Sequence, residues 1–330
     1  MKKSLLALAA LTAFTGAVSA QSNVTMYGRI DLAVGKAVGT NQKALGNGSG
    51  SRLGLTGSED LGGGMAAIFN IEHRFDADTG ANSSATRMWS ARSIVGLKGA
   101  FGQVVLGREY TTAFLGSQLI NDPWGWDTVV SSTPGAGLNT LLTGGNIAKV
   151  RNDSAVTYNI NMSGFSFGAQ IAEASDTLNN FQKKPYNFSA GYAAGPFTVN
   201  AGYEKTGQVA AAAAEWATLG GTYNLGMVKL GASIGSGRTA ADAKNQSYMV
   251  TAVGVMGQGE LRGSYGKLTT DQPGIGKSDL AKGFALGYHY ALSKRTTLYT
   301  DYVRNTGTGG VFGLVGTEKN GYDFGIKHNF

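Results

Sequence analysis

The chain of 330 residues contains no cysteine, which excludes disulfide bonds and thiol redox chemistry. Its 51 glycines, 14 tyrosines and 14 phenylalanines make it too rich in Gly and Tyr for a helical protein and too regularly patterned for a disordered one. Lys and Arg number 28 against 21 Asp and Glu, and this modest excess without a basic run argues against a nucleic-acid partner and favours the handling of anions.

The first segment, MKKSLLALAALTAFTGAVSA, predicts a secretory signal cleaved after Ala20. Two lysines precede an apolar run that ends at Phe14, and small residues follow. The run is too short to span a bilayer, and the alternative of a buried N-terminal helix does not account for this three-part order. The expected division is a signal peptide at 1–20 and a mature domain at 21–330, whose net charge without the two lysines is 26 − 21 = +5.

The mature chain begins with a strongly alternating segment, VTMYGRIDLAV. Val24 and Met26 share one parity, whereas Arg29 lies on the other. Such alternation predicts a strand with one apolar and one polar face. The pattern recurs with charges on one parity only in PFTVNAGYE and GELRGSYG, whereas SYMVTAVGV is ambiguous in parity. The chain is therefore expected to consist largely of strands.

Seven very short connections that carry Gly, Pro or Ser predict hairpin turns. They lie at 60–64, 98–102, 162–164, 194–196, 223–226, 257–259 and 293–295. Seven hairpins give fourteen strands, and the first and last segments bring the expected number to sixteen. Eight longer polar segments lie between the hairpins, near 37–49, 76–87, 111–150, 174–185, 205–213, 237–245, 269–281 and 305–319. Short turns thus alternate with long loops along the chain.

An even number of strands with short turns on one side and long loops on the other is the pattern of an outer-membrane barrel. No later stretch reaches the roughly eighteen apolar residues of a membrane helix, so only a closed barrel could span. A soluble β-sandwich or propeller also alternates, but a closed sheet of sixteen strands is too wide for side chains to fill. The expected fold is an all-β, 16-stranded antiparallel transmembrane β-barrel with short periplasmic turns, long outer loops and a polar face lining water.

The third long segment, 111–150, differs from a solvated surface loop. It is rich in large apolar residues, and between Thr111 and Ala148 its only charges are Asp122 and Asp127. About forty residues is also far beyond the usual loop length. Two interpretations remain open: a loop that contacts a partner or a neighbouring subunit, and a loop folded into the lumen with its apolar side against the wall. Either aspartate could alternatively cap a short helix in the loop.

The last segment, NGYDFGIKHNF, alternates to the end of the chain. Every second side chain from Tyr322 is large and mostly apolar, and the terminal Phe330 lies on this apolar parity. A soluble domain would more often end in a frayed polar tail. The apolar parity is expected to contact lipid or a neighbouring subunit.

Several blocks of the sequence resemble the trimeric general diffusion porins of Gram-negative outer membranes, particularly the β-proteobacterial type. These blocks are SNVTMYGRIDLAVG, GSRLGLTGSEDLGGGMAAIFNIEHRF, ARSIVGLKGAFGQVVLGREY, RNDSAVTYNI, ALSKRTTLYTDY and GIKHNF. The resemblance implies a homotrimer in the outer membrane, each subunit a separate pore for passive diffusion of small hydrophilic solutes and ions, with no cofactor. It favours a third loop folded into the lumen. It also implies that Phe330 acts as the signal by which the barrel-assembly machinery selects the chain.

The alternation within each predicted strand indicates which charged side chains face the lumen and are candidate pore residues. Arg52, Arg92 and Arg151 fall on the lumen parity, as judged from the apolar residues that alternate with them. Arg108 falls on the outer parity by simple counting, but it ends a strand at GREY, where a bulge could turn it inward. Glu109, at the root of the third loop, falls on the lumen parity.

The resemblance implies a constriction in which arginines face acidic residues of the third loop, Asp122 and Asp127. Arg52 and Arg151 match such positions best. Cations on one wall and carboxylates on the other would create a transverse field that biases ion entry without a tight binding site. Because arginine stays ionised and outnumbers the carboxylates, we expect a mild preference for anions.

The alternative functions are a barrel-type outer-membrane enzyme and an adhesin or receptor. Two G-x-S-x-G strings surround Ser166 and Ser233, but both lie within alternating strands rather than at a strand-turn-helix elbow. The three histidines, His73, His289 and His328, lie on separate predicted strands, which argues against a catalytic or metal site. We therefore expect neither enzyme activity nor a bound metal.

Overall fold

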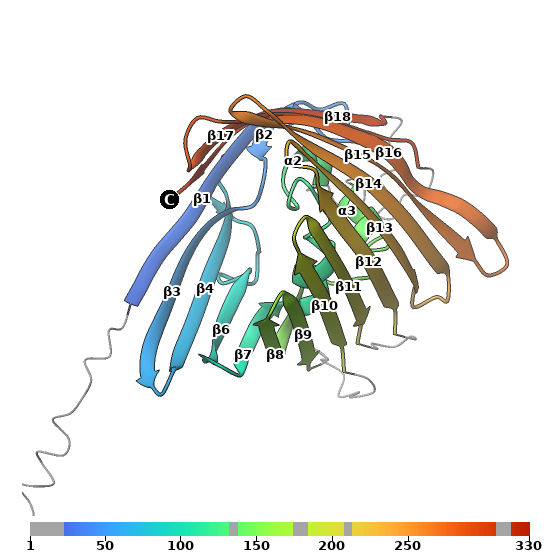
Figure 1. Ribbon diagram of the computed structural model, residues 1–330. Helices are drawn as coiled ribbons and strands as arrows, with labels where there is room; N and C mark the ends of the chain where they lie inside the picture. The colour runs from blue at the N-terminus through green and yellow to red at the C-terminus, as the bar shows by residue number, and fades with distance from the viewer. Residues whose placement is uncertain (1–22, 132–137, 174–183, 208–212, 308–317) are drawn as a thin grey trace, which may run out of the picture.

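The computed structural model describes residues 23–131, 138–173, 184–207, 213–307 and 318–330. The signal peptide predicted at 1–20 lies outside these residues. Antiparallel strands form one sheet that curls round until its first and last strands meet (Figure 1). The described residues form a single closed barrel.

Within the described residues the sheet has eighteen strands, of which two are short additions from loops, β2 (Ala44–Asn47) and β5 (Ala81–Asn82). The other sixteen form the wall, as predicted. They are β1 (Asn23–Lys36), β3 (Ser51–Gly62), β4 (Met65–Asp76), β6 (Arg92–Gly99), β7 (Gly102–Tyr110), β8 (Arg151–Met162), β9 (Phe165–Ala172), β10 (Tyr186–Ala194), β11 (Phe197–Lys205), β12 (Glu215–Asn224), β13 (Val228–Arg238), β14 (Lys244–Met256), β15 (Gly259–Gln272), β16 (Gly276–Ala291), β17 (Thr296–Asn305) and β18 (Asn320–Asn329).

The two faces of the wall differ as the alternation predicts. On β1, Val24 and Met26 are 62% and 63% exposed, whereas Asp31, on the opposite parity, is fully buried. The same contrast recurs around the barrel, with exposed large apolar side chains on the outside and buried polar ones on the inside. An apolar outer face and a polar interior are the arrangement of a barrel that stands in lipid and encloses water.

All seven predicted hairpin turns join consecutive wall strands. One predicted long loop, 269–281, is instead mostly strand, because β15 and β16 continue to a three-residue turn at 273–275. The pairing is maintained to Gln272 opposite Gly276, and Lys267 and Asp279 form a 2.8 Å ion pair on this extension. Its polar composition made it look like a loop. In Figure 1 this hairpin projects beyond its neighbours.

The barrel closes where the two ends of the chain meet. β1 pairs with β18 from Arg29 opposite Asn329 to Lys36 opposite Tyr322. The terminal Phe330 continues this ladder: its backbone N–H donates to the Gly28 carbonyl at 3.1 Å, and the Gly28 N–H donates to the Phe330 carbonyl at 3.0 Å. The C-terminal residue is therefore part of the seam rather than a free tail.

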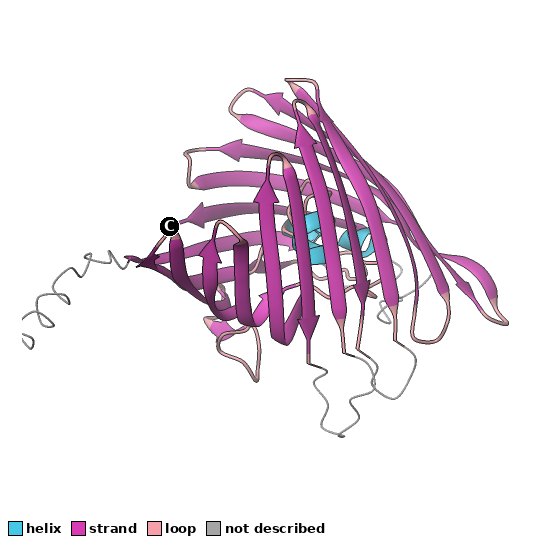
Figure 2. Cartoon of the chain, turned by 60° about the horizontal axis from the view of Figure 1, so that its bottom comes forward, coloured by secondary structure: helices cyan, strands magenta, loops and turns pink. Residues whose placement is uncertain are grey.

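The third loop lies inside the barrel, where Figure 2 shows its helices enclosed by strands. It contains the π-helix η1 (Phe114–Gln118) and the short helices α2 (Thr128–Ser131) and α3 (Asn139–Leu142). η1 packs against β9 to β12, α3 against β13 to β15, and α2 against β17 and β18. No helix in the described part of the chain is long and apolar enough to cross a membrane.

The apolar side of this loop forms the hydrophobic core. Trp124, Val130 and Leu141 cluster there with inward-facing wall residues that include Trp216 and Met249. Burial of these side chains keeps the loop against the wall. The interpretation of the loop as folded into the lumen is therefore confirmed.

Candidate pore constriction

Three arginines from consecutive wall strands lie side by side on the lumen face. Arg29 on β1 is opposite Arg52 on β3, which in turn is opposite Arg74 on β4. Leu53, the next residue along β3, is 40% exposed on the outer face, so Arg52 faces inward. The Arg52 Nε donates to the Gly50 carbonyl at 3.1 Å. Among the described residues, no carboxylate lies within ion-pair distance of Arg52.

Arg92 faces the lumen from β6 but is paired. Its Nε and Nη2 contact the two carboxylate oxygens of Glu109 at 2.8 and 2.7 Å, a bidentate ion pair. The Glu109 side chain is almost completely buried, whereas that of Arg92 is 28% exposed. Both residues lie on the lumen side, as their parity indicated, but their charges largely cancel.

Tyr110, the last residue of β7, joins two further arginines. Its hydroxyl oxygen accepts hydrogen bonds from Arg74 Nη2 at 3.0 Å and from Arg151 Nη2 at 2.6 Å. The Arg151 guanidinium lies over the Tyr110 ring, 4.2 Å from its centroid. Arg74 also donates to Glu72 at 2.7 Å, but Arg151 has no carboxylate partner among the residues described. Arg52 and Arg151 thus both lack a carboxylate partner among the described residues.

Arg108 lies at a β-bulge, as the sequence allowed, but the bulge does not bring it into the constriction. The register between β7 and β8 shifts at this point, and Gly107 adopts a φ of 124°. Residues that pair across neighbouring strands point to the same face of the sheet. The pairs that start at Arg108 lead across β6, β4 and β3 to Met26 on the outer face, so Arg108 points outward as well. Arg108 contacts Asp153, which also pairs with Arg87 at 2.8 Å. We therefore do not place Arg108 in the constriction.

Asp122 does not face the pore either. Its carboxylate accepts the backbone N–H groups of Trp124 and Trp126, each at 2.9 Å. The group is buried inside the loop, and this burial raises the pKa of Asp122 above its usual value. Asp122 therefore caps the backbone of a loop turn, which is close to the alternative that the sequence left open.

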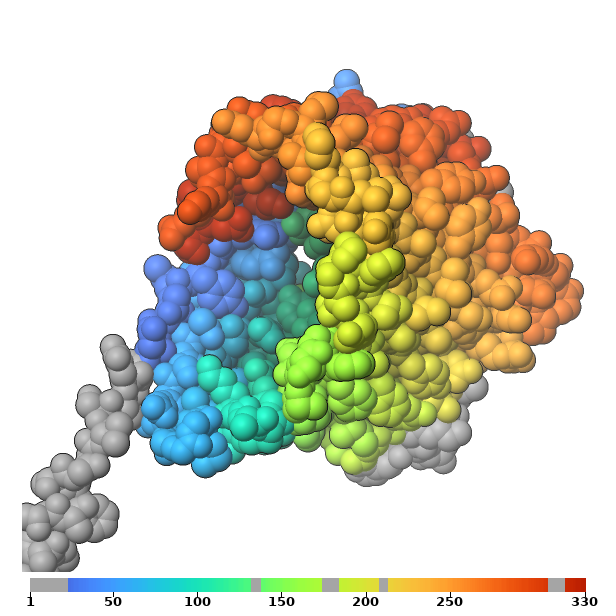
Figure 3. All heavy atoms as spheres, in the orientation of Figure 1, coloured from blue at the N-terminus to red at the C-terminus, as the bar shows by residue number. Residues whose placement is uncertain are grey.

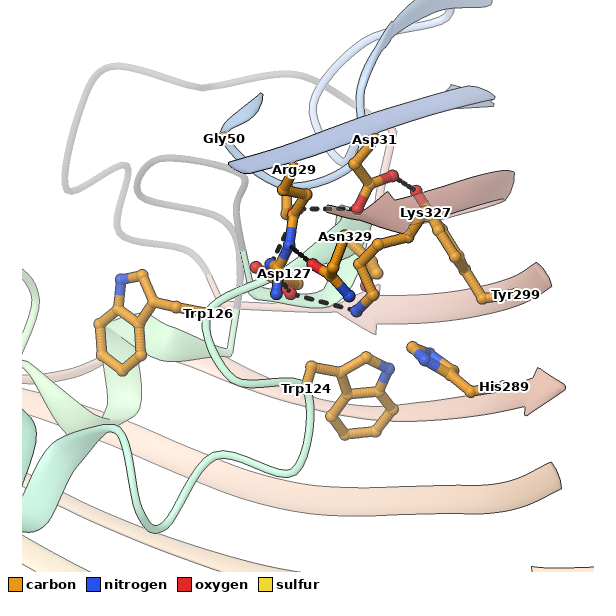
Figure 4. A network of polar contacts seen from close by, with 12 residues as sticks. Arg29, Asp31, Gly50, Trp124, Trp126, Asp127, His289, Tyr299, Lys327 and Asn329 are labelled. Carbon is orange, nitrogen blue, oxygen red and sulfur yellow. Dashed lines mark hydrogen bonds and ion pairs between the residues drawn. The ribbon is translucent and has the colours of Figure 1, made fainter. Parts of the chain in front are cut away.

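Asp127 reaches the wall but is neutralised there. Its carboxylate lies 2.8 Å from Arg29 Nη1 and 3.3 Å from Lys327 Nζ (Figure 4). Arg29 also donates to the Asn329 side chain at 2.8 Å and to Ser49 at 3.2 Å. The predicted facing of carboxylates and arginines across open water is replaced by direct ion pairing.

Neighbouring loop residues are fixed by the wall. The Trp124 indole N–H donates to Asp301 on β17 at 2.7 Å, and the Val129 N–H donates to Asp323 on β18 at 2.7 Å. His289 lies beside Trp124 in Figure 4 and is 3.1 Å from both carboxylate oxygens of Asp301. These buried charge-assisted hydrogen bonds hold the loop in one place.

An open passage remains between this loop and the first strands. Figure 3 shows the gap between the blue strands at the start of the chain and the green residues of the loop. Among the described residues, the constriction groups are six cations and three carboxylates, a net charge of 6 − 3 = +3: Arg29, Arg52, Arg74, Arg92, Arg151 and Lys327 against Glu72, Glu109 and Asp127.

Sequence reasoning missed five contributors, Arg29, Glu72, Arg74, Tyr110 and Lys327. All of these except Tyr110 lie on the polar parity of their strands, so alternation contained the signal for those four. Tyr110 lies at the end of a strand after a bulge, where parity counting fails.

A closed antiparallel barrel with an apolar outer face, a polar lumen and an internal loop that narrows the passage is a diffusion channel of an outer membrane. The comparisons with known proteins agree. The profile of the Gram-negative porin family matches residues 7–310, and the chain belongs to that family. It is an outer-membrane porin.

Individual relatives cover the full length. Outer membrane porin protein 32 of Delftia acidovorans is 32% identical, with all of both chains aligned. The structure of an anion-selective porin from Comamonas acidovorans superposes with a TM-score of 0.74 at 28% identity, covering 94% of this chain and 100% of that one. The trimer form of the outer-membrane protein OmpT of Vibrio cholerae is 16% identical and superposes with a TM-score of 0.73, covering 94% of this chain and 99% of that one. At this identity, the match to OmpT shows the fold alone.

The residues considered for an enzyme lie apart from one another. Ser166 and Ser233 lie within β9 and β13 and are followed by strand rather than helix. His73, His289 and His328 lie on β4, β16 and β18. Within the part of the chain that the structure describes, no group of three His, Cys, Asp or Glu could hold a metal ion. The relatives in the family are channels.

Proposed function

We propose that this porin is a homotrimeric channel for passive diffusion of small hydrophilic solutes, with a mild preference for anions. The observation that carries the proposal is the pairing of charge at the constriction. Glu72, Glu109 and Asp127 each have a cationic partner within 3 Å, whereas Arg52 and Arg151 have no carboxylate partner among the described residues. The free charge that an ion meets is therefore positive.

The preference should be moderate, because water in the pore keeps the dielectric constant high and salt screens charges over about 8 Å. The description of the Comamonas acidovorans porin as anion-selective supports the same direction. The zero-current potential across a salt gradient tests it. We expect chloride to be preferred over sodium, and the preference to fall in the Arg52→Ala, Arg151→Ala double variant. A cation-selective wild type, or a double variant with unchanged selectivity, would exclude these arginines as the filter.

We further propose that residues 1–20 are a cleaved signal peptide, that residues 21–330 form the mature barrel, and that Phe330 is read by the barrel-assembly machinery. N-terminal sequencing of the purified protein tests the cleavage, and crosslinking in detergent tests the trimer. Passage requires no turnover, so steady large conductance in single-channel recording is expected. A silent protein that cleaves lipid or peptide would favour the enzyme alternative.

A further inference from the structure

Three aromatic side chains form a continuous row along the loop side of the passage. Tyr110 stacks on Phe114 with centroids 5.5 Å apart and planes at 11°, and Phe114 meets Trp126 edge-on at 4.9 Å. Phe114 is buried between the other two, which are both partly exposed. Trp126 adopts a φ of 67°, and in Figure 4 its ring lies on the opposite side of the loop from Trp124. The row therefore presents a partly exposed ring, that of Trp126, at its loop end.

This aromatic row and the arginine row of the wall meet at both ends. At one end, Arg74 donates to the Tyr110 hydroxyl at 3.0 Å. At the other, Arg29 pairs at 2.8 Å with Asp127, the residue next to Trp126. Between these contacts the wall contributes Arg52 and the loop contributes Phe114. Arg151 lies over the Tyr110 ring, Phe114 stacks on the same ring, and Phe114 is itself buried, so Trp126 is the ring of this row that stays partly exposed beside the Asp127–Arg29 pair.

The loop presents no free carboxylate to this passage in its described part. Asp122 is turned into the loop, and Asp127 is bound to Arg29 and Lys327. The described part of the loop therefore sets no unpaired carboxylate against the arginines.

We propose that the constriction favours organic anions that carry an aromatic ring over hydrophilic anions of similar size and equal charge. This inference rests on the proposed anion preference and adds the substrate class. The carboxylate of such a solute meets Arg52 and Arg151, whose planar guanidinium groups match carboxylate geometry. Its ring packs on Trp126, in an offset or edge-on contact. A hydrophilic anion gains the first contact but not the second.

Bi-ionic potentials in planar bilayers test the proposal with the full-length mature trimer. Sodium benzoate and sodium gluconate are each measured against sodium chloride. We expect the benzoate-to-gluconate permeability ratio to be about threefold above the ratio of their mobilities in water, as a single aromatic contact would give. A ratio equal to that of the free mobilities overturns the proposal. The sodium chloride gradient is recorded on the same channels. Lost chloride preference there would refute the proposed function itself, so the two failures are distinguishable.

Two variants at one position assign the effect to the ring. Trp126→Asn removes the ring, and asparagine tolerates the positive φ of this position. It should bring the benzoate-to-gluconate ratio down to the mobility ratio, while chloride remains preferred over sodium. Trp126→Phe keeps an aromatic ring and should retain most of the benzoate preference. An unchanged ratio in Trp126→Asn, or equal losses in both variants, would overturn the role of the ring.

Discussion

The Asp127 carboxylate on the third loop lies 2.8 Å from the Arg29 guanidinium on the first strand. This acidic residue of the loop is therefore paired with the wall instead of facing it across water. This contact fixes the loop across the lumen and removes a negative charge from the passage. Charge at this pore depends on which ion pairs form, and changing one member of a pair should change selectivity.

Asp127→Asn should raise the preference for anions. The amide keeps a hydrogen-bond acceptor for Arg29 but removes the charge that neutralises Arg29 and Lys327. The measurement is the zero-current potential in a salt gradient. Asp242→Asn is the matched control, because Asp242 pairs with Arg238 in an exposed pair away from the constriction. A shift toward cations in Asp127→Asn would contradict the assignment.

Glu109→Gln should destabilise the barrel more than the double variant Arg92→Met, Glu109→Gln does. Removing one partner of a buried ion pair leaves the other uncompensated and costs about 3–5 kcal/mol. Because Arg92 is 28% exposed to the pore, water offsets part of that cost, and we expect about 1–2 kcal/mol. Equilibrium urea unfolding in detergent micelles measures both variants. Equal stability of the single and double variants would show that the two charges are not coupled.

Asp122 should make the stability of the loop depend on pH. Burial raises the pKa of Asp122 above its unfolded value, so its contribution is fully present below the unfolded pKa and is lost as pH rises through the folded pKa. Asp122→Asn removes this dependence. The difference in thermal midpoint between the wild type and the variant should therefore move in favour of the wild type on acidification. A difference that stays constant between neutral and acidic pH would contradict the shift.

Gly28→Ala should impair closure of the barrel. A Cβ at this position would lie 2.3 Å from the Phe330 ring and 2.6 Å from the Arg52 carbonyl oxygen, so the seam would have to shift. Overpacking of this kind costs about 1–3 kcal/mol. Gly263→Ala is the control, because its nearest neighbour is a side-chain atom at 3.7 Å. The yield of folded trimer in the membrane is the measurement, and equal yields would be inconsistent with a tight seam.

Truncation of the terminal ring tests the same seam from the other side. Phe330→Ala removes the side chain that covers Gly28 but leaves the backbone ladder between the two residues intact. If the assembly machinery reads the ring, the yield of trimer should fall while trimers that do form conduct normally. A normal yield would remove Phe330 as an assembly signal.

Alternation and turn chemistry were enough to predict the barrel, because each strand has one face in lipid and one in water. The ambiguous segment SYMVTAVGV shows where this rule weakens: Met249 is apolar although it faces inward, since it packs under the third loop. A strand covered on both faces does not alternate in polarity.

The constriction was less predictable for a different reason. Parity placed Arg52 and Arg92 on the lumen side, but pairing joins residues far apart in sequence. Asp127 meets Arg29, 98 residues away, and Lys327, 200 residues away. No local sequence pattern indicates either ion pair. The bulge before Tyr110 also shifts the register at the point where Arg108 had to be assigned.

The contacts of the loop with β18 have a consequence for the order of folding. Val129 is bound to Asp323, 194 residues further along the chain, and Asp127 is bound to Lys327. Contacts of such sequence separation form late, because the intervening chain must first be brought together. The loop thus gains its last attachments only when the final strand arrives. A barrel halted before that step would hold the loop by its contacts with β9 to β17 but would lack the attachments of Asp127 and Val129, so closing the wall and fixing this part of the loop are one event.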